Sequence, residues 1–175
     1  MRYYLIEQDK KDIQIPVLKD WFKRITDGNK KSPNIDSLGD RVLFTVDAKS
    51  GATYPEMIFY PFLLVTKEIR KCLSLYEPNM EFQEVFLLDQ KSKESHQYFR
   101  PDIPKVACLS EESVFSFGHV ELTKIVLDQH KIPNKVLFRI DGPEKNYYII
   151  RLDALESFLR RGLNAVIVNE VVVAK

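Results

Sequence analysis

Two stretches of this chain, residues 41–88 and 135–173, share one order of elements: strand, turn, strand, helix and strand. Their opening segments are alike, RVLFTVD in the first stretch and KVLFRID in the second. In each stretch a pair of apolar β-formers then precedes an amphipathic segment, Leu64–Val65 and Ile149–Ile150. The parallel predicts either a duplicated ββαβ unit or a chance likeness between two hairpins that each lead into a helix, because strands draw on few residue types.

Helical periodicity marks two segments. Thr66 is placed to cap a first helix whose apolar residues follow an i, i+3, i+4, i+7 spacing: Ile69, Cys72, Leu73 and Tyr76. A second helix begins near Leu152, presents Leu155, Phe158 and Leu159 on one face, and stops before Gly162. Both segments are therefore expected to bury one face against a sheet or against each other.

The remaining apolar segments predict further strands, including residues 2–6 at the start and the stretch 165–173 near the end. The apolar residues of segment 15–25 follow a helical spacing, although Pro16 is equally compatible with an extended lead-in. We therefore predict the α+β class, with mixed or antiparallel sheets and few helices. A chain of 175 residues suits one domain spanning residues 1–175.

The charge balance constrains the partners. Lys plus Arg number 26 and Asp plus Glu number 25, giving a net charge of +1, whereas a duplex nucleic-acid binder usually carries a clear basic excess. No apolar stretch approaches transmembrane length, and the first residues turn charged too early for a signal peptide. Cys72 and Cys108 lie in apolar surroundings typical of buried thiols in a reducing compartment. We expect a cytoplasmic protein that binds neither nucleic acid nor membrane.

No pattern for catalysis stands out. The histidines His96, His119 and His130 lack partners at metal-ligand spacing, and no segment resembles a phosphate loop, so we expect no metal, no cofactor and no catalytic residues. His119 and Glu121 would share one face of a strand, which is compatible with an acid–base pair or with an ordinary polar strand face. The sequence therefore favours a protein without enzymatic activity.

Aromatic residues near loops and strand ends are better candidates for function. Tyr98, Phe99 and Arg100 are consecutive, and Tyr54 lies in a polar loop. Tyrosine and arginine are enriched among the residues that dominate protein–protein binding. We predict these four residues as partner-binding candidates, with peripheral core packing as the alternative for each.

The second unit resembles a family of bacterial polymorphic-toxin immunity proteins, described as immunity protein, MXAN-0049 type. The resemblance rests on FRIDG at residues 138–142, on Ile149 and Ile150, and on an amphipathic helix that ends in Gly162-Leu163 before a closing strand. An earlier PNMEF segment, residues 78–82, also fits the layout. The resemblance covers roughly the last two-thirds of the chain.

This resemblance implies a cytoplasmic antidote that binds a cognate toxin domain and blocks it stoichiometrically. We expect the toxin contacts to come from residues 27–40, 48–56, 89–100 or the turn at 110–113. Two other functions remain as alternatives: a small enzyme that uses His119 and Glu121, or a protein-interaction subunit of a larger assembly.

Overall fold

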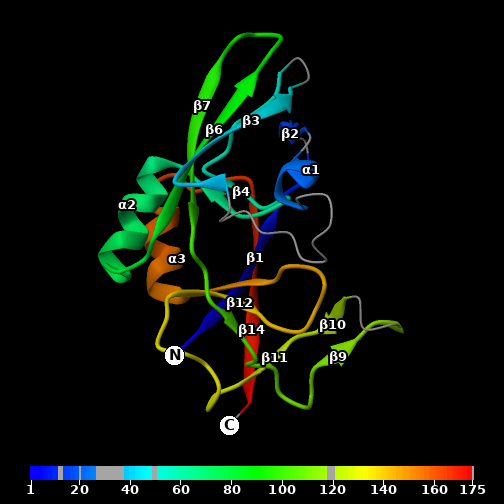
Figure 1. Cartoon of the computed structure of the whole chain (residues 1–175). Helices are drawn as coiled ribbons and strands as arrows, with labels where there is room; N and C mark the ends of the chain where they lie inside the picture. The colour runs from blue at the N-terminus through cyan, green and yellow to red at the C-terminus, as the bar shows by residue number, and fades with distance from the viewer. Residues whose placement is uncertain (12–13, 20, 27–37, 49–50, 118–120, 175) are drawn as a thin grey trace.

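The computed structural model describes residues 1–11, 14–19, 21–26, 38–48, 51–117 and 121–174. Within these residues the strands form two six-stranded mixed sheets and one two-stranded sheet, and three helices accompany them. Figure 1 shows the long helices together on one side of the molecule. The fold is therefore α+β, as the sequence predicts.

The middle of the chain builds the first sheet, whose strand order is β2-β3-β6-β7-β5-β4. Its members are β2 (Val17–Leu18), β3 (Arg41–Asp47), β4 (Met57–Ile58), β5 (Leu64–Val65), β6 (Phe82–Asp89) and β7 (Ser95–Pro101). Strands β3 and β6 run parallel, whereas all other neighbours are antiparallel. Side chains of β3 and β6 alternate between buried and more exposed positions, which is the period of two that a pleated strand requires.

The end of the chain builds the second sheet together with its beginning. The order is β11-β14-β1-β13-β12-β8. Its members are β1 (Tyr3–Gln8), β8 (Lys105–Val106), β11 (Val126–Asp128), β12 (Leu137–Ile140), β13 (Tyr148–Arg151) and β14 (Val166–Ala174). Strand β1 lies between β13 and β14 and is antiparallel to both. The small third sheet pairs β9 (Val114–Phe115) with β10 (Leu122–Lys124).

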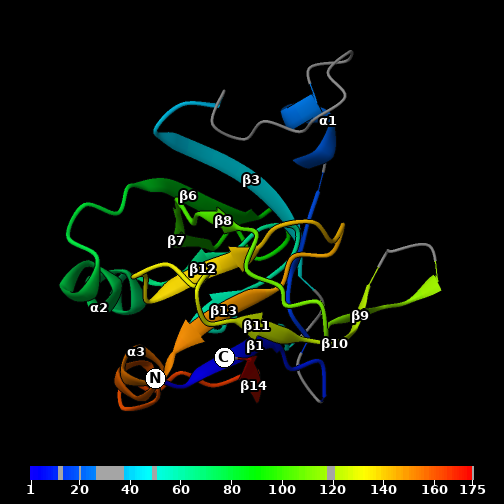
Figure 2. The same cartoon turned by 90° about the horizontal axis from the view of Figure 1, so that it is seen from below.

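The helices are α1 (Trp21–Thr26), α2 (Lys67–Tyr76) and α3 (Leu152–Leu159). Helix α2 buries Ile69, Cys72 and Leu73, and α3 buries Ala154, Leu155 and Phe158. The predicted apolar faces are confirmed except that Tyr76 is only partly buried and Leu159 is 49% exposed. The two helices pack side by side in both views, and the Tyr76 hydroxyl lies 2.6 Å from Ser157 Oγ (Figures 1 and 2).

Both long helices begin where the sequence predicts, but neither N-cap residue makes a capping hydrogen bond with its side chain. Thr66 occupies the N-cap of α2 in an extended conformation, yet its side chain makes no capping hydrogen bond. Arg151 occupies the N-cap of α3 and pairs instead with Asp153 of the first turn, Nε to Oδ1 at 2.7 Å and Nη2 to Oδ2 at 2.8 Å. Acidic residues in the first turn stabilise a helix because they face the positive end of its dipole.

The two sheets share a strand arrangement. In each, the strand before the helix and the strand after it run parallel, with an antiparallel strand between them: β5-β7-β6 in the first sheet and β13-β1-β14 in the second. A hairpin partner flanks the strand before the helix, and a parallel strand flanks the strand after it. The molecule therefore contains two similar units.

One strand correspondence inferred from the sequence is wrong. Strand β12 forms a hairpin with β13, whereas β3 does not pair with β5 but lies parallel to β6. By position in the sheet, β12 therefore corresponds to β4, and β3 corresponds to β11. The likeness between RVLFTVD and KVLFRID reflects residue types that are common to apolar strands. Two strands can therefore have similar sequences and still pair with different neighbours.

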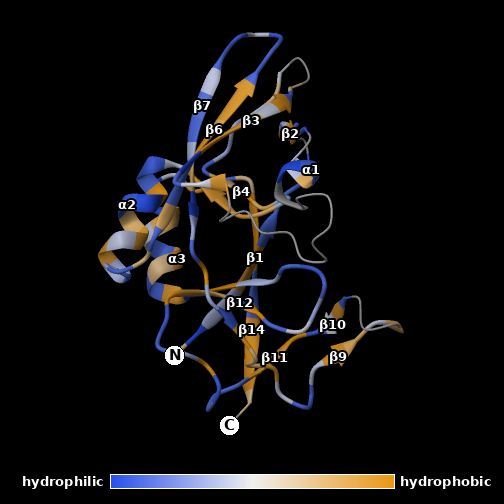
Figure 3. Cartoon of the chain, in the orientation of Figure 1, coloured by the Kyte–Doolittle hydropathy of each residue, from blue (hydrophilic) through white to orange (hydrophobic). Residues whose placement is uncertain are grey.

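A shared core cluster joins the two sheets. It combines Met57 and Phe99 of the first sheet with Ile6 and Ile150 of the second, and the buried faces of α2 and α3 close it. Two further clusters fill the other side of each sheet. Figure 3 shows the apolar strands converging on this interior, while the turn between β6 and β7 is hydrophilic.

Candidate partner-binding surface

The structure places two of the four predicted partner-binding residues in the core. Tyr98 is 2% exposed, and its hydroxyl donates a hydrogen bond of 2.7 Å to the carbonyl oxygen of Pro55. Phe99 points to the other face of the sheet, where the guanidinium of Arg70 lies 4.3 Å from the centre of its ring. Adjacent residues of a strand face opposite sides, and both sides of β7 are covered here.

Tyr54 is half-buried and stacks on His96. Their ring centres are 3.5 Å apart and their planes are tilted by 16°. Burial raises the pKa of the Tyr54 phenol, and the nearby carboxylates of Asp89 and Glu94 raise it further. The phenol therefore stays neutral at physiological pH, and the stack fixes the loop before β4 against the β6–β7 hairpin.

Arg100 lies in a shallow polar cleft of about 300 Å³. Its Nε donates to Gln83 Oε1 at 3.0 Å, and Gln83 in turn donates to the carbonyl oxygen of Gly39. The carboxylates of Asp40, Glu81 and Asp102 line the same cleft. Arg100 is thus held in one orientation among acidic neighbours, and Tyr54 and Arg100 are the predicted residues nearest to the surface.

Parts of the predicted contact segments lie outside the described residues: 27–37, 49–50 and His119 of the suggested acid–base pair. Among the described residues, no group of three or more His, Cys, Asp or Glu side chains is arranged to hold a metal ion. No helix of the described chain is long and apolar enough to cross a membrane.

An exposed aromatic patch lies at the start of α1 and in the turn between β4 and β5. We define the aromatic patch as Trp21, Phe22 and Tyr60. The Trp21 ring meets Phe22 edge-on at 5.6 Å and Tyr60 at 5.8 Å between ring centres. Phe22 is 55% exposed and Tyr60 is 70% exposed. Exposed aromatic rings gathered in this way are typical of protein-binding surfaces.

The core supports the patch from below. Trp21 meets Phe62 at 6.4 Å between ring centres, and Phe62 meets the buried Phe44 at 5.8 Å. Trp21 itself is partly buried against the cluster that fills this side of the first sheet. The exposed rings of Phe22 and Tyr60 therefore contact a tryptophan that is itself packed against the core.

Sequence periodicity missed this patch because segment 15–25 is not one helix. Val17 and Leu18 form β2, where a period of two turns Val17 outward and Leu18 inward. Helix α1 then starts at Trp21, so Phe22 does not share a buried face with Val17 as the helical spacing suggested. The available signal was Pro16, which is compatible with the extended conformation found here.

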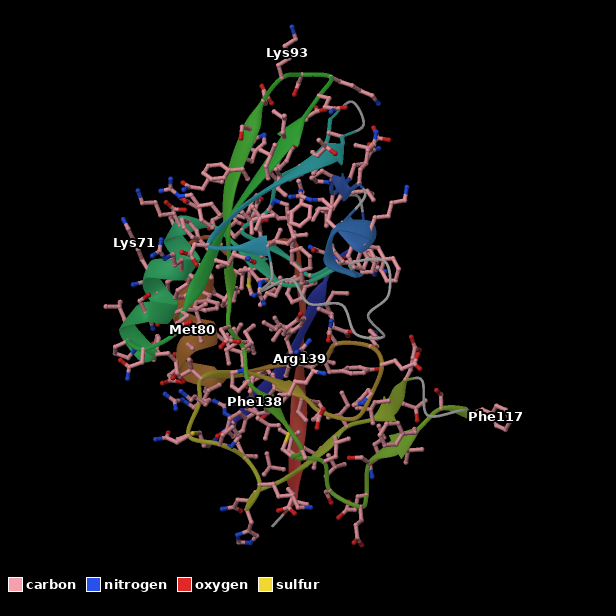
Figure 4. All side chains as sticks on the ribbon, viewed as in Figure 1. Lys71, Met80, Lys93, Phe117, Phe138 and Arg139 are labelled. Atoms are coloured by element: carbon pink, nitrogen blue, oxygen red, sulfur yellow. The ribbon has the colours of Figure 1, made fainter. Side chains whose placement is uncertain are left out.

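Another exposed aromatic residue lies elsewhere on the surface. Phe117 follows β9 in the β9–β10 hairpin, and its side chain is fully exposed (Figure 4). Figures 1 and 2 both place this hairpin and α1 on the side of the molecule away from α2 and α3. The exposed aromatic features thus share one side, opposite the two long helices.

Neither a protein-family model nor a curated protein sequence matches this chain.

Proposed function

We propose that this protein is a cytoplasmic immunity protein, which binds a cognate bacterial toxin domain and neutralises it as a stoichiometric inhibitor without catalysis of its own. The observation that carries the proposal is the aromatic patch. Two rings that are more than half exposed, Phe22 and Tyr60, flank a tryptophan that is fixed to the core.

The energetics of binding support this assignment of the surface. Burying apolar surface contributes about 25 cal/mol per Å², and an aromatic side chain can bury about 150–250 Å². Aromatic side chains also lose little conformational entropy on binding, because they have only two rotatable bonds. Because Trp21 is already packed on Phe62, binding needs little further ordering of the patch, which favours high affinity.

The resemblance of the second unit to immunity proteins supplies the kind of partner. Tight inhibition of a toxin requires a pre-organised surface with a few aromatic or arginine anchors. The aromatic patch supplies the aromatic anchors, and Arg100, held by Gln83, supplies an arginine of fixed orientation.

The test is co-expression with the C-terminal domain encoded by the neighbouring upstream reading frame. Growth should be restored by the wild-type chain, and the two proteins should co-purify. The double variant F22A/Y60A should weaken the affinity by at least about 30-fold, as expected for hot-spot residues. Leu75→Ala is the matched control because Leu75 is 73% exposed on α2, on the other side of the molecule.

The outcomes separate the two parts of the proposal. If the wild-type chain is folded and well expressed but neither restores growth nor co-purifies, the immunity function is wrong. If the wild type neutralises the toxin and F22A/Y60A does so equally well, the function stands and the aromatic patch is not its binding surface.

A further inference from the structure

The β9–β10 hairpin presents an apolar side chain to water at the far end of a projecting element. Phe117 is 104% exposed, and Val114 on the same hairpin is 49% exposed. Figure 4 shows Phe117 pointing away from the body of the molecule. Among the described residues no other large hydrophobic side chain is as exposed. A fully exposed phenylalanine leaves its whole apolar side chain available to a partner.

The hairpin is tied to the core along its length. Tyr147 is 3% exposed, and its hydroxyl accepts a hydrogen bond of 2.8 Å from the backbone N–H of Leu122. At the base of the hairpin, Ser113 Oγ donates to the carbonyl oxygen of Val126 at 2.8 Å and accepts from its N–H at 3.1 Å. Phe115 and Leu122 also pack against the core cluster of the second sheet.

The two arms are also joined close to Phe117. The N–H of Ser116 donates to the carbonyl oxygen of Glu121 at 2.7 Å, and the N–H of Glu121 donates to Ser116 Oγ at 3.1 Å. Further down, Thr123 Oγ1 donates to the carbonyl oxygen of Val114 at 3.0 Å. The residue next to Phe117 is therefore fixed before any partner arrives, which lowers the entropy lost on binding.

The hairpin and the turn before it are acidic. Their described residues include three carboxylates, those of Glu111, Glu112 and Glu121, and one ammonium group, that of Lys124. Lys124 Nζ lies 3.9 Å from Glu112 Oε2, so these residues keep a net charge of −2 among themselves. Lys145, which pairs with Glu7, also interacts with Glu121 and offsets part of that negative charge. A protein surface that approaches this hairpin is attracted if the rim around its binding pocket is basic.

We propose that the hairpin is a second anchor, which inserts Phe117 into an apolar pocket with a basic rim on the partner protein. The partner is the toxin domain of the proposed function, on which this inference rests. The hairpin and the aromatic patch lie on the same side of the molecule, so one partner can contact both. The acidic hairpin steers the partner, and the phenylalanine slows its dissociation.

The experiment measures binding kinetics between the full chain and the toxin domain encoded upstream, made as a catalytically inactive variant. Phe117→Ala should raise the Kd at least about 30-fold, mainly through faster dissociation. Its matched control is Leu75→Ala, another exposed apolar residue, which should bind as the wild type does. Because Phe117 is fully exposed, its truncation should leave the melting temperature unchanged.

A charge reversal tests the basic rim. Glu111→Lys should slow association by about tenfold at low salt, and the difference should shrink as salt screens the charges. Glu156→Lys is the control because it makes the same charge change on the exposed side of α3. If both Phe117→Ala and Glu111→Lys bind like the wild type, the hairpin is not an anchor, although the immunity function stands. If the wild type does not bind the toxin domain at all, the partner assignment and the immunity function fail together.

Discussion

At the scale of single residues, the Glu77 carboxylate links the end of α2 to the segment before β12. Glu77 ends α2 and is only 9% exposed. Its Oε1 accepts a hydrogen bond of 2.9 Å from the N–H of Val136, and its Oε2 lies 2.8 Å from Lys135 Nζ. Glu77 therefore contacts two residues at the start of the second unit, Lys135 and Val136, which follow it by 58 and 59 positions in the sequence. A buried N–H that loses its acceptor is expensive, whereas a half-exposed ion pair contributes little.

We predict that Glu77→Ala lowers the free energy of unfolding by about 1–3 kcal/mol, because the N–H of Val136 loses its acceptor. Glu77→Gln should lose less, since the amide oxygen can still accept this bond. Lys135→Ala should change stability by less than about 1 kcal/mol. Urea denaturation of the three variants checks the order. Equal stabilities for Glu77→Ala and Lys135→Ala would contradict it.

The buried thiols predict a dependence of stability on alkaline pH. Burial raises the pKa of Cys108 from an ordinary value of 9.0 to about 11, and burial also raises the pKa of Cys72. The folded state therefore keeps a proton that the unfolded chain releases above pH 9. The stabilisation is complete below pH 9 and is lost as the pH rises towards 11.

Urea midpoints measured from pH 8 to pH 11 should fall for the wild type and fall less steeply for Cys108→Ala. Other groups titrate in this range, so the difference between the two slopes is the informative quantity. A thiol reagent at pH 8 should react with Cys72 and Cys108 only after unfolding, because both are buried in the folded chain. Rapid labelling of the native protein would show that the thiols are accessible.

At the scale of elements, the turn after α3 depends on one backbone conformation. Gly162 has a φ of +87°, and the N–H of the following Leu163 donates to the carbonyl oxygen of Phe158 at 3.1 Å. A Cβ added at this glycine would meet nothing within 4 Å, so space is available and only the backbone conformation disfavours other residues. The turn directs the chain from α3 into β14.

Gly162→Ala should therefore destabilise the protein by about 1 kcal/mol, the usual magnitude for a left-handed alanine. Gly162→Asn should lose less because asparagine adopts this conformation more readily. Thermal unfolding of both variants provides the measurement. A larger loss for asparagine than for alanine would mean that side-chain contacts, rather than backbone conformation, dominate at this position.

At the scale of the whole molecule, the N-terminal strand completes the C-terminal unit. Strand β1 takes the place in the second sheet that β7 takes in the first, although β7 follows its helix in sequence and β1 begins the chain. Tyr3 pairs with Val171 in antiparallel register, so the last residues of β14 run beside the first residues of the chain. If the two ends were joined, β1 would follow β14 in the chain as β7 follows β6, and the elements of both units would then come in the same order.

We predict that a circular permutant folds when a linker of about four residues joins the ends and the chain opens between Lys10 and Lys11. Both lysines are exposed, so the opening disturbs no packing. The permutant should keep a single cooperative unfolding transition by circular dichroism. A control opened between Leu5 and Ile6, inside β1, should be strongly destabilised because both residues are buried. Failure of the first permutant alone would contradict this role of β1.

The sequence by itself determined the local elements. Apolar spacing located α2 and α3, and branched residues located β3, β5, β13 and β14. Such signals arise between neighbours in the chain, because a helix or a strand places its side chains with a fixed period. The sequence also predicted the α+β class, and it offered two similar units as one of two interpretations, although it matched β3 to the wrong strand of the second unit.

Only the tertiary structure decided which strands pair and which aromatic residues are covered. The insertion of β1 between β13 and β14 joins the two ends of the chain, and no local pattern encodes it. Tyr98 and Phe99 are buried because distant segments cover both faces of β7, whereas the side chains of Phe22 and Phe117 are more than half exposed. Burial of a side chain depends on contacts between residues far apart in sequence, and those contacts form only when the whole chain folds.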